Sequence, residues 1–235
     1  MRPPKSTQPP APDPVQPCER LPIEAMIRTL RGTVRRWQAP SVSRIADRDA
    51  DPFRILISTV ISLRTRDETT LAAAERLFGL ADTPSAMVEL DAERIARAIY
   101  PAGFYRTKAV TILEISRVVL DRYGGRVPDR VDDLVQLKGV GRKTANLVVG
   151  RGYGRAAICV DTHVHRIVNR WGWVRTRTPE QTERALQGLL PRRYWIPING
   201  WLVVFGQQIC TPQSPRCSGC SLVTWCRRDG VRHFR

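Results

Sequence analysis

Lysine is scarce in this strongly basic chain of 235 residues. Lysine and arginine together make up 38 residues, yet the only lysines are Lys5, Lys108, Lys138 and Lys143. A guanidinium stays protonated and cannot act as a nucleophile, whereas an amine can do so once its pKa falls. A lysine kept among so many arginines is therefore a candidate for chemistry. The alternative for each is an ordinary solvated cation.

Long apolar runs are also missing. No stretch approaches the roughly 18 apolar residues that span a bilayer. The first residues show neither the apolar core of a signal peptide nor the Arg/Ser pattern of a transit peptide. We therefore expect a soluble, intracellular protein without a membrane partner, located in the cytoplasm or nucleoid if its source is prokaryotic.

The charge balance favours a different partner. The formal net charge is +16 at pH 7, while 42% of the residues are hydrophobic, so the chain can form a core and still carry a strong positive field. Such a field attracts polyanions, with nucleic acid ahead of an anionic membrane surface. We expect a monomer whose partner is nucleic acid.

Convincing strands are a third absence, and the predicted fold class is all-α, with about ten short helices. Residues 1–20 hold seven prolines and are predicted to be a disordered tail. The segment 156–160 is β-like but short and isolated. A long amphipathic helix is predicted from Thr107 to Arg122, ending at Gly124-Gly125. Capping patterns predict further helix starts at Asp51-Pro52, Thr65-x-x-Glu68, Thr83-Pro84, Asp91 and Thr178-Pro179-Glu180-Gln181.

The most informative stretch is L-K-G-V-G-R-K-T at residues 137–144, followed by V-D-T-H at 160–163. The first segment predicts a helix, a glycine hairpin and the start of a second helix. Glycines allow a tight turn and a close approach to a ligand, and the free N–H groups suit a DNA phosphate. Lys143 lies in the first turn of that second helix and Asp161 follows eighteen residues later, and an amine and a carboxylate beside a phosphate-binding hairpin suggest chemistry on a nucleotide sugar. The alternative role for Asp161 is a helix N-cap.

Four cysteines are concentrated near the end of the chain, in the pattern C-x6-C-x2-C-x5-C. In an intracellular protein such thiols stay reduced, so metal ligation is a better interpretation than disulfides. A single wrapping loop with unequal spacing favours a [4Fe–4S] cluster over a Cys₄ zinc site, and four free thiols are the remaining alternative. The four residues are Cys210, Cys217, Cys220 and Cys226, while Cys18 and Cys159 stand apart.

These three motifs, in this order, closely resemble the endonuclease III branch of the helix-hairpin-helix DNA glycosylases, over roughly residues 25–228. The resemblance implies two helical domains with DNA in the cleft between them. One would be a six-helix barrel with the hairpin, at residues 45–155. The other would join residues 21–44 to 156–235 and carry the cluster.

The resemblance also implies a bifunctional glycosylase and AP lyase that removes damaged bases, with oxidised pyrimidines as the expected substrates, and cleaves the abasic site by β-elimination. Lys143 matches the nucleophile that forms a Schiff base, and Asp161 matches the catalytic aspartate. The four clustered cysteines match the ligands of a [4Fe–4S] cluster. The expected partner is double-stranded DNA with damaged bases or abasic sites.

Further positions match the DNA-binding parts of the family. The expected hairpin contacts are Gly139, Val140, Gly141 and Arg142. Phe104 matches an apolar wedge, and Leu63 and Arg64 match a segment in which the family has a glutamine that fills the vacated space. Arg64 departs from that pattern, which puts the opposite-base preference in question. His163 and His165 are interpreted as structural.

Two other functions remain open at this point. One is a mismatch-specific glycosylase of the same superfamily. Its adenine-specific branch is disfavoured because Lys143 is present and residues 53–66 contain no acid. A thymine-specific branch is harder to separate because Arg64 lies in the recognition segment. The other is a non-catalytic DNA-binding module with a structural metal, which the joint presence of Lys143 and Asp161 disfavours.

Overall fold

The computed structural model describes residues 22–235, so the predicted proline-rich tail lies outside the described residues. Within this range the chain forms twelve α-helices and two short 3₁₀-helices and has no strand, which confirms the all-α fold class. The helices are α1 (Ile23–Val34), α2 (Ser41–Arg48), α3 (Pro52–Ser62), α4 (Asp67–Phe78), α5 (Pro84–Val88), α6 (Ala92–Ile99), α7 (Tyr105–Tyr123), α8 (Val131–Leu134), α9 (Arg142–Tyr153), α10 (Thr162–Trp171), α11 (Pro179–Leu189), η1 (Arg192–Tyr194), α12 (Pro197–Gln208) and η2 (Val223–Trp225).

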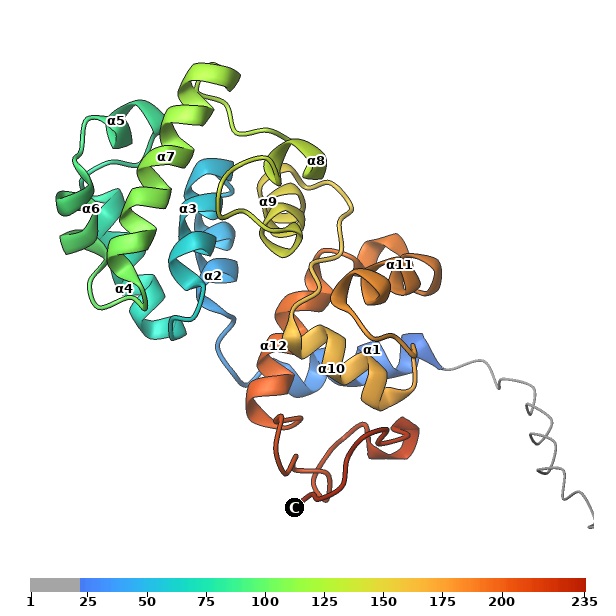
Figure 1. Ribbon diagram of the computed structural model, residues 1–235. Coiled ribbons are helices and arrows are strands. Elements are labelled where there is room, and N and C mark those ends of the chain that lie inside the picture. The colour runs from blue at the N-terminus through green and yellow to red at the C-terminus, as the bar shows by residue number, and fades with distance from the viewer. Residues whose placement is uncertain (1–21) are drawn as a thin grey trace, which may run out of the picture.

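The buried residues form two separate apolar cores. The first core is built from α2–α9, which we call the first lobe. The second core is built from α1 and α10–α12, which together with the C-terminal segment form the second lobe. Figure 1 shows α1, at the blue end of the chain, lying beside α10 and α12 of the second lobe. The first core already begins with α2, whose Val42 precedes the start of the barrel domain that was expected at residue 45.

The central element of the first lobe is α3. Its run Phe53–Ile61 is almost wholly buried, with only Arg54 reaching toward solvent, which explains why its sequence is too apolar for a surface element. The helix packs against α9 and α4. Since α9 begins one residue before Lys143, the buried α3 fixes the helix that carries this amine. None of the described helices is both long and apolar enough to cross a membrane.

Most of the predicted helix starts are confirmed by side-chain caps. The Asp51 carboxylate accepts a hydrogen bond from the Arg54 N–H at 2.8 Å, and Thr83, Asp91 and Thr178 cap α5, α6 and α11 in the same way. The prediction at Thr65 is wrong. Helix α4 begins at Asp67, after Arg66, and the Thr65 hydroxyl instead bonds the neighbouring loops.

The β-like segment 156–160 has an unusual place between the lobes. Ala157 and Cys159 belong to the first core, whereas Ile158 and Val160 belong to the second. This alternation is that of an extended chain, whose successive side chains point in opposite directions. The segment pairs with no strand in the described residues, and its two faces pack on different cores. It leads directly to Asp161.

Candidate active site

The predicted glycine hairpin connects α8 to α9. Gly139 has a φ of +78°, and a Cβ at this position would lie 2.8 Å from Cγ2 of Thr111 on α7. Both observations require glycine here. A Cβ on Gly141 would meet no atom of the protein, so its lack of a side chain leaves open space at the start of α9. Val140 is buried in the first core, which leaves its backbone for any ligand contact.

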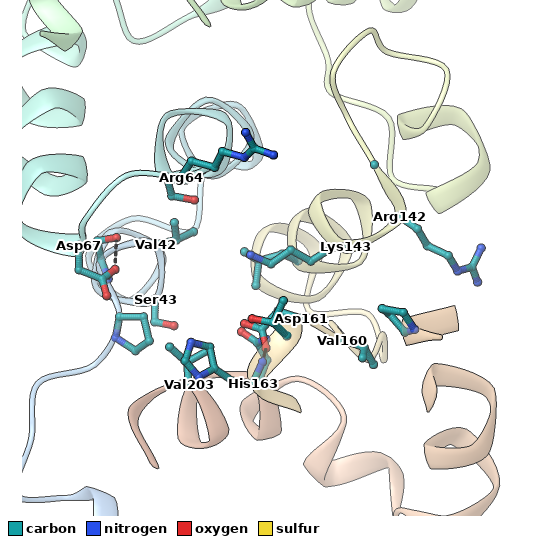
Figure 2. Close-up of a pocket in the computed structure, with 18 of the residues that line it drawn as sticks. Val42, Ser43, Arg64, Asp67, Arg142, Lys143, Val160, Asp161, His163 and Val203 are labelled. Atoms are coloured by element: carbon teal, nitrogen blue, oxygen red, sulfur yellow. Dashed lines mark hydrogen bonds between the residues drawn. The ribbon is translucent and has the colours of Figure 1, made fainter. Parts of the chain in front are cut away.

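Lys143 and Asp161 line one cleft of about 610 Å³ between the two lobes. Lys143 lies in the first turn of α9, and Asp161 precedes α10. Figure 2 shows both side chains reaching into the same space from these two elements. Within the described residues the Lys143 amine has no hydrogen bond or ion pair. The cleft therefore offers an unengaged amine beside a carboxylate.

The Asp161 carboxylate has a structural role as well. Its Oδ1 accepts hydrogen bonds from the His163 and Val164 N–H groups, both at 2.9 Å, so Asp161 is the N-cap of α10. Both bonds use the same oxygen, which leaves Oδ2 for the cleft. The cap thus fixes the carboxylate in one orientation and engages only one of its two oxygens.

Asp67 is a second carboxylate in this cleft, and the sequence interpretation missed it. Its Oδ1 accepts hydrogen bonds from the N–H and the hydroxyl of Ser41, at 3.0 and 2.7 Å, and its Oδ2 accepts one from Gln207 at 3.1 Å. Burial alone would raise the pKa of Asp67. The bonds from Ser41 and Gln207 and the charge of Lys143 outweigh burial and lower it. An acid in the first turn of α4 resembles an ordinary helix-dipole partner, so no local signal marked it.

The two histidines near the cleft have structural partners. Nδ1 of His163 accepts a hydrogen bond from the Arg166 guanidinium at 3.1 Å, and the ring packs so closely on α12 that a Cβ at Gly206 would lie 2.4 Å from Nδ1. Burial, followed by the Arg166 and Lys143 charges, lowers the pKa of His163 despite the opposing Asp161 charge. His165 bonds the Thr182 hydroxyl at 2.6 Å.

Arg142, an expected DNA contact, is engaged in an ion pair between the lobes. Its Nε and one terminal nitrogen donate to the two carboxylate oxygens of Glu183 on α11, at 2.9 and 2.8 Å. Glu183 is 3% exposed and also accepts a hydrogen bond from Asn146 at 2.9 Å. Figure 2 shows the Arg142 side chain pointing away from Lys143. In this structure the Arg142 side chain therefore connects α9 to α11 of the second lobe.

The expected wedge residues lie on two neighbouring loops at the edge of the first lobe. Phe104 is 63% exposed, so its ring does not belong to the core. The Arg64 guanidinium lies 5.6 Å from the centroid of the Phe104 ring. Arg64 also lines the cleft of Lys143 and Asp161. The two loops therefore present a cation and an aromatic ring together beside the reactive groups.

The four clustered cysteines converge, although they come from a loop of little regular structure. All four line one small cavity of the second lobe and are free thiols. Arg170 on α10 lies against them, because its guanidinium contacts Sγ of Cys210 at 3.4 Å. In residues 22–235 no three His, Cys, Asp or Glu side chains are arranged around a single ion. Four thiols around one apolar cavity are a donor set that a thiolate-bound metal centre takes. They belong to Cys210, Cys217, Cys220 and Cys226.

Comparisons with known proteins support the same interpretation. The model of the HhH-GPD superfamily base excision DNA repair protein matches residues 57–192. The chain is 53% identical to Endonuclease III of Thermotoga maritima over 191 residues, which cover 80% of this chain and 90% of that protein. It is 44% identical to Endonuclease III homolog 1, chloroplastic, of Arabidopsis thaliana over 184 residues, which cover 74% of this chain but 48% of that longer protein. The solved structure of a trapped endonuclease III–DNA covalent intermediate in an estranged-adenine complex is 34% identical, has a TM-score of 0.71, and is matched over 80% of this chain and 93% of that one.

The chain belongs to the HhH-GPD superfamily of base excision DNA repair proteins, since the match spans most of the first lobe and the start of the second. Lys143 and Asp161 of the cleft both lie within the matched region. Within the superfamily the chain is a member of the endonuclease III family, the DNA glycosylases and AP lyases that its three motifs resemble.

Proposed function

We propose that this protein removes oxidised pyrimidines from double-stranded DNA and then cleaves the abasic strand through a lysine Schiff base. The observation that carries the proposal is the unengaged Lys143 amine beside the capped Asp161 carboxylate in one cleft. A single-stranded or flipped nucleotide must enter such a cleft before its sugar can react. We also propose that it acts as an intracellular monomer.

The two side chains have complementary roles in the proposed reaction. As the C1′–N bond to the damaged base breaks, positive charge builds on the sugar, and the Asp161 carboxylate stabilises it. The Lys143 amine attacks C1′ with its lone pair and loses one proton. The C1′–O4′ bond then breaks, its electron pair goes to O4′, which takes up a proton, and the protonated imine that results acidifies the 2′ hydrogen. Removal of that proton moves its electron pair toward the imine and expels the 3′ phosphate, so the strand breaks.

DNA binding would use the hairpin and the two exposed loops. The backbone of Gly139–Gly141 offers N–H groups to a phosphate, and Gly141 has no side chain to keep it away. Arg142 would contribute its remaining donors while paired with Glu183. Phe104, Leu63 and Arg64 would fill the space that a flipped nucleotide leaves, because an apolar wedge offsets part of the lost stacking.

The cysteine loop would hold a [4Fe–4S] cluster through Cys210, Cys217, Cys220 and Cys226. Such a loop has few apolar residues, so thiolate bonds to the cluster would stabilise its fold, and binding energy becomes folding energy. Burial raises the pKa of Cys226 to about 11, so this thiol must lose its proton when it becomes a ligand. The Arg170 guanidinium beside Cys210 would compensate the negative charge of the thiolates.

Borohydride trapping tests the proposed nucleophile. Wild-type protein incubated with abasic-site DNA and borohydride should form a covalent adduct, because the reductant converts the imine to a stable amine. Lys143→Ala should bind the DNA and form no adduct. The matched control is Lys138→Ala, which removes another amine of the same hairpin, one that pairs with Glu114 on the surface and is 73% exposed. An undiminished adduct with Lys143→Ala would refute the assignment.

A further inference from the structure

Lys108 is the only lysine in the described residues that is buried, with 7% of its surface exposed. It lies in the first turn of α7, and its amine makes three hydrogen bonds. The acceptors are the carbonyl oxygens of Ile61 and Leu63, at 2.7 and 2.5 Å, and the hydroxyl oxygen of Thr65 at 2.8 Å. An ammonium group has three donors, so the set is complete. Ile61 lies in the last turn of α3, and the other two acceptors lie in the segment that connects α3 to α4.

Thr65 extends this set to the second loop. Its hydroxyl oxygen also accepts a hydrogen bond from the Gly103 N–H at 3.1 Å, and its hydroxyl proton is directed to the Leu63 carbonyl at 3.3 Å. The Lys108 backbone N–H donates to the Phe104 carbonyl at 3.0 Å. A Cβ on Gly103 would lie 2.5 Å from the Arg64 carbonyl oxygen. The two loops are therefore in direct contact, and the Lys108 amine reaches the second loop through the Thr65 hydroxyl.

Both loops hold a residue in an unfavourable backbone conformation. Arg64 has a φ of 53° and Phe104 a φ of 57°, in the left-handed region that side-chain-bearing residues rarely adopt. Such conformations persist only where the surrounding structure holds them. The hydrogen bonds of Lys108 and Thr65 surround these two residues. Burial lowers the pKa of Lys108 to about 8, which shows that burying its charge is unfavourable. The three hydrogen bonds of the amine offset part of this cost.

We propose that Lys108 is a positioning residue, which holds residues 63–65 and 103–104 as one preformed element so that Arg64 and Phe104 meet the DNA together. The inference rests on the proposed function, because it assigns these loops to the flipped nucleotide. A preformed element loses less conformational freedom on binding than two independent loops. The effect therefore belongs to base extrusion and not to the attack by Lys143.

The first test compares two substrates with Lys108→Met, which keeps an unbranched side chain one atom shorter and removes the donors. Single-turnover removal of an oxidised pyrimidine from duplex DNA should fall about tenfold or more, since extrusion involves a few kcal/mol. Borohydride trapping on abasic single-stranded DNA should stay within about twofold of wild-type, because no base has to leave a duplex. An unchanged duplex rate, or equal losses on both substrates, overturns the inference. Absence of an adduct with wild-type protein would instead overturn the proposed function.

Thr65 gives a second test that does not depend on the folding of Lys108→Met. Thr65→Val removes the hydroxyl that joins the loops, and Thr65→Ser restores it. Thr65→Val should show the same selective loss on duplex DNA, and Thr65→Ser should recover most of the rate. In addition, Lys108→Met should reduce the duplex rate much less when Phe104→Ala is already present, since it acts through that ring. Full additivity of the two changes, or equal rates for the two Thr65 variants, overturns the inference.

Discussion

The ion pair between Arg142 and Glu183 leads to an asymmetric prediction about stability. Arg142 is the partly solvated member, with a side chain 46% exposed, whereas the Glu183 side chain is 4% exposed. Arg142→Ala leaves a buried carboxylate whose remaining partners are the neutral amides of Asn146, at 2.9 Å, and Gln187, at 3.5 Å. Glu183→Gln leaves an arginine that water can solvate and an amide oxygen that still accepts hydrogen bonds. The exposed residue should therefore be the more costly one to replace.

The magnitudes follow from what each change leaves behind. Breaking a fully buried ion pair lowers stability by about 3–5 kcal/mol, and access of water to the cleft reduces this to about 2–3 kcal/mol for Arg142→Ala. Glu183→Gln should lower the free energy of unfolding by about 1 kcal/mol, the net value of one ordinary hydrogen bond. For a protein of this size, 1 kcal/mol corresponds to about 2–4 °C in Tm. Arg142→Ala should thus lower Tm by about 4–12 °C.

Thermal unfolding followed by circular dichroism measures both shifts under one set of conditions. The matched control is Arg184→Ala, an exposed arginine of α11 that forms no ion pair within the described residues. It should change the free energy of unfolding by less than about 0.5 kcal/mol. The reasoning is refuted if Glu183→Gln lowers Tm as much as Arg142→Ala, or if Arg142→Ala behaves like Arg184→Ala.

Four further predictions concern the cleft, the wedge, the cluster and Lys108. Asp161→Asn should keep the Tm and the DNA affinity, because asparagine caps a helix as well as aspartate does. The rate of base removal should fall about 10²-fold or more. A near-normal rate would mean that Asp161 acts only as a cap. Arg64→Gln should change the ranking of opposite bases in a cleavage panel, and an unchanged ranking would separate Arg64 from base recognition. The wild-type protein should be yellow-brown and contain about four irons per chain. Cys217→Ser should lower the iron content, the solubility and the DNA affinity together. A colourless, fully active protein with one zinc per chain would contradict the cluster assignment. In NMR spectra of lysine side chains, one resonance should titrate with a pKa of about 8 and vanish in Lys108→Met. A lysine in the unfolded chain titrates near 10.5, so between about pH 8 and 10.5 the unfolded state binds more protons than the folded state. The free energy of unfolding of the wild-type protein should therefore rise with pH across this interval, relative to that of Lys108→Met. Parallel profiles of stability against pH for the two proteins would argue against the lowered pKa.

Local interactions explain which parts of the fold were predictable. The caps at Asp51, Asp91 and Thr178 join atoms three residues apart, so the sequence pattern contains both partners. The cap expected at Thr65 failed because its hydroxyl is engaged by Gly103 and Lys108, which are 38 and 43 residues away. A pattern read over a few residues contains no information about such partners.

The same distinction applies to the candidate site. Lys143 and Asp161 each lie in a short motif whose backbone geometry is local, so the sequence could propose both. Asp67 and Glu183 escaped because their roles depend on Ser41 and Arg142, at separations of 26 and 41 residues. The sequence does not show which segments come into contact where the two lobes pack together. Those contacts place Asp67 in the cleft and pair Glu183 with Arg142 of the other lobe.

The segment 156–160 has a consequence for how the molecule tolerates changes in length. Its successive side chains pack alternately in the first and the second core. Inserting or deleting a single residue would reverse this alternation, and Ile158 would then point toward the first core instead of the second. The same slip would rotate the start of α10 and carry the Asp161 carboxylate away from the Lys143 amine. These few residues act as a spacer of fixed length between nucleophile and carboxylate, although none of them takes part in the chemistry.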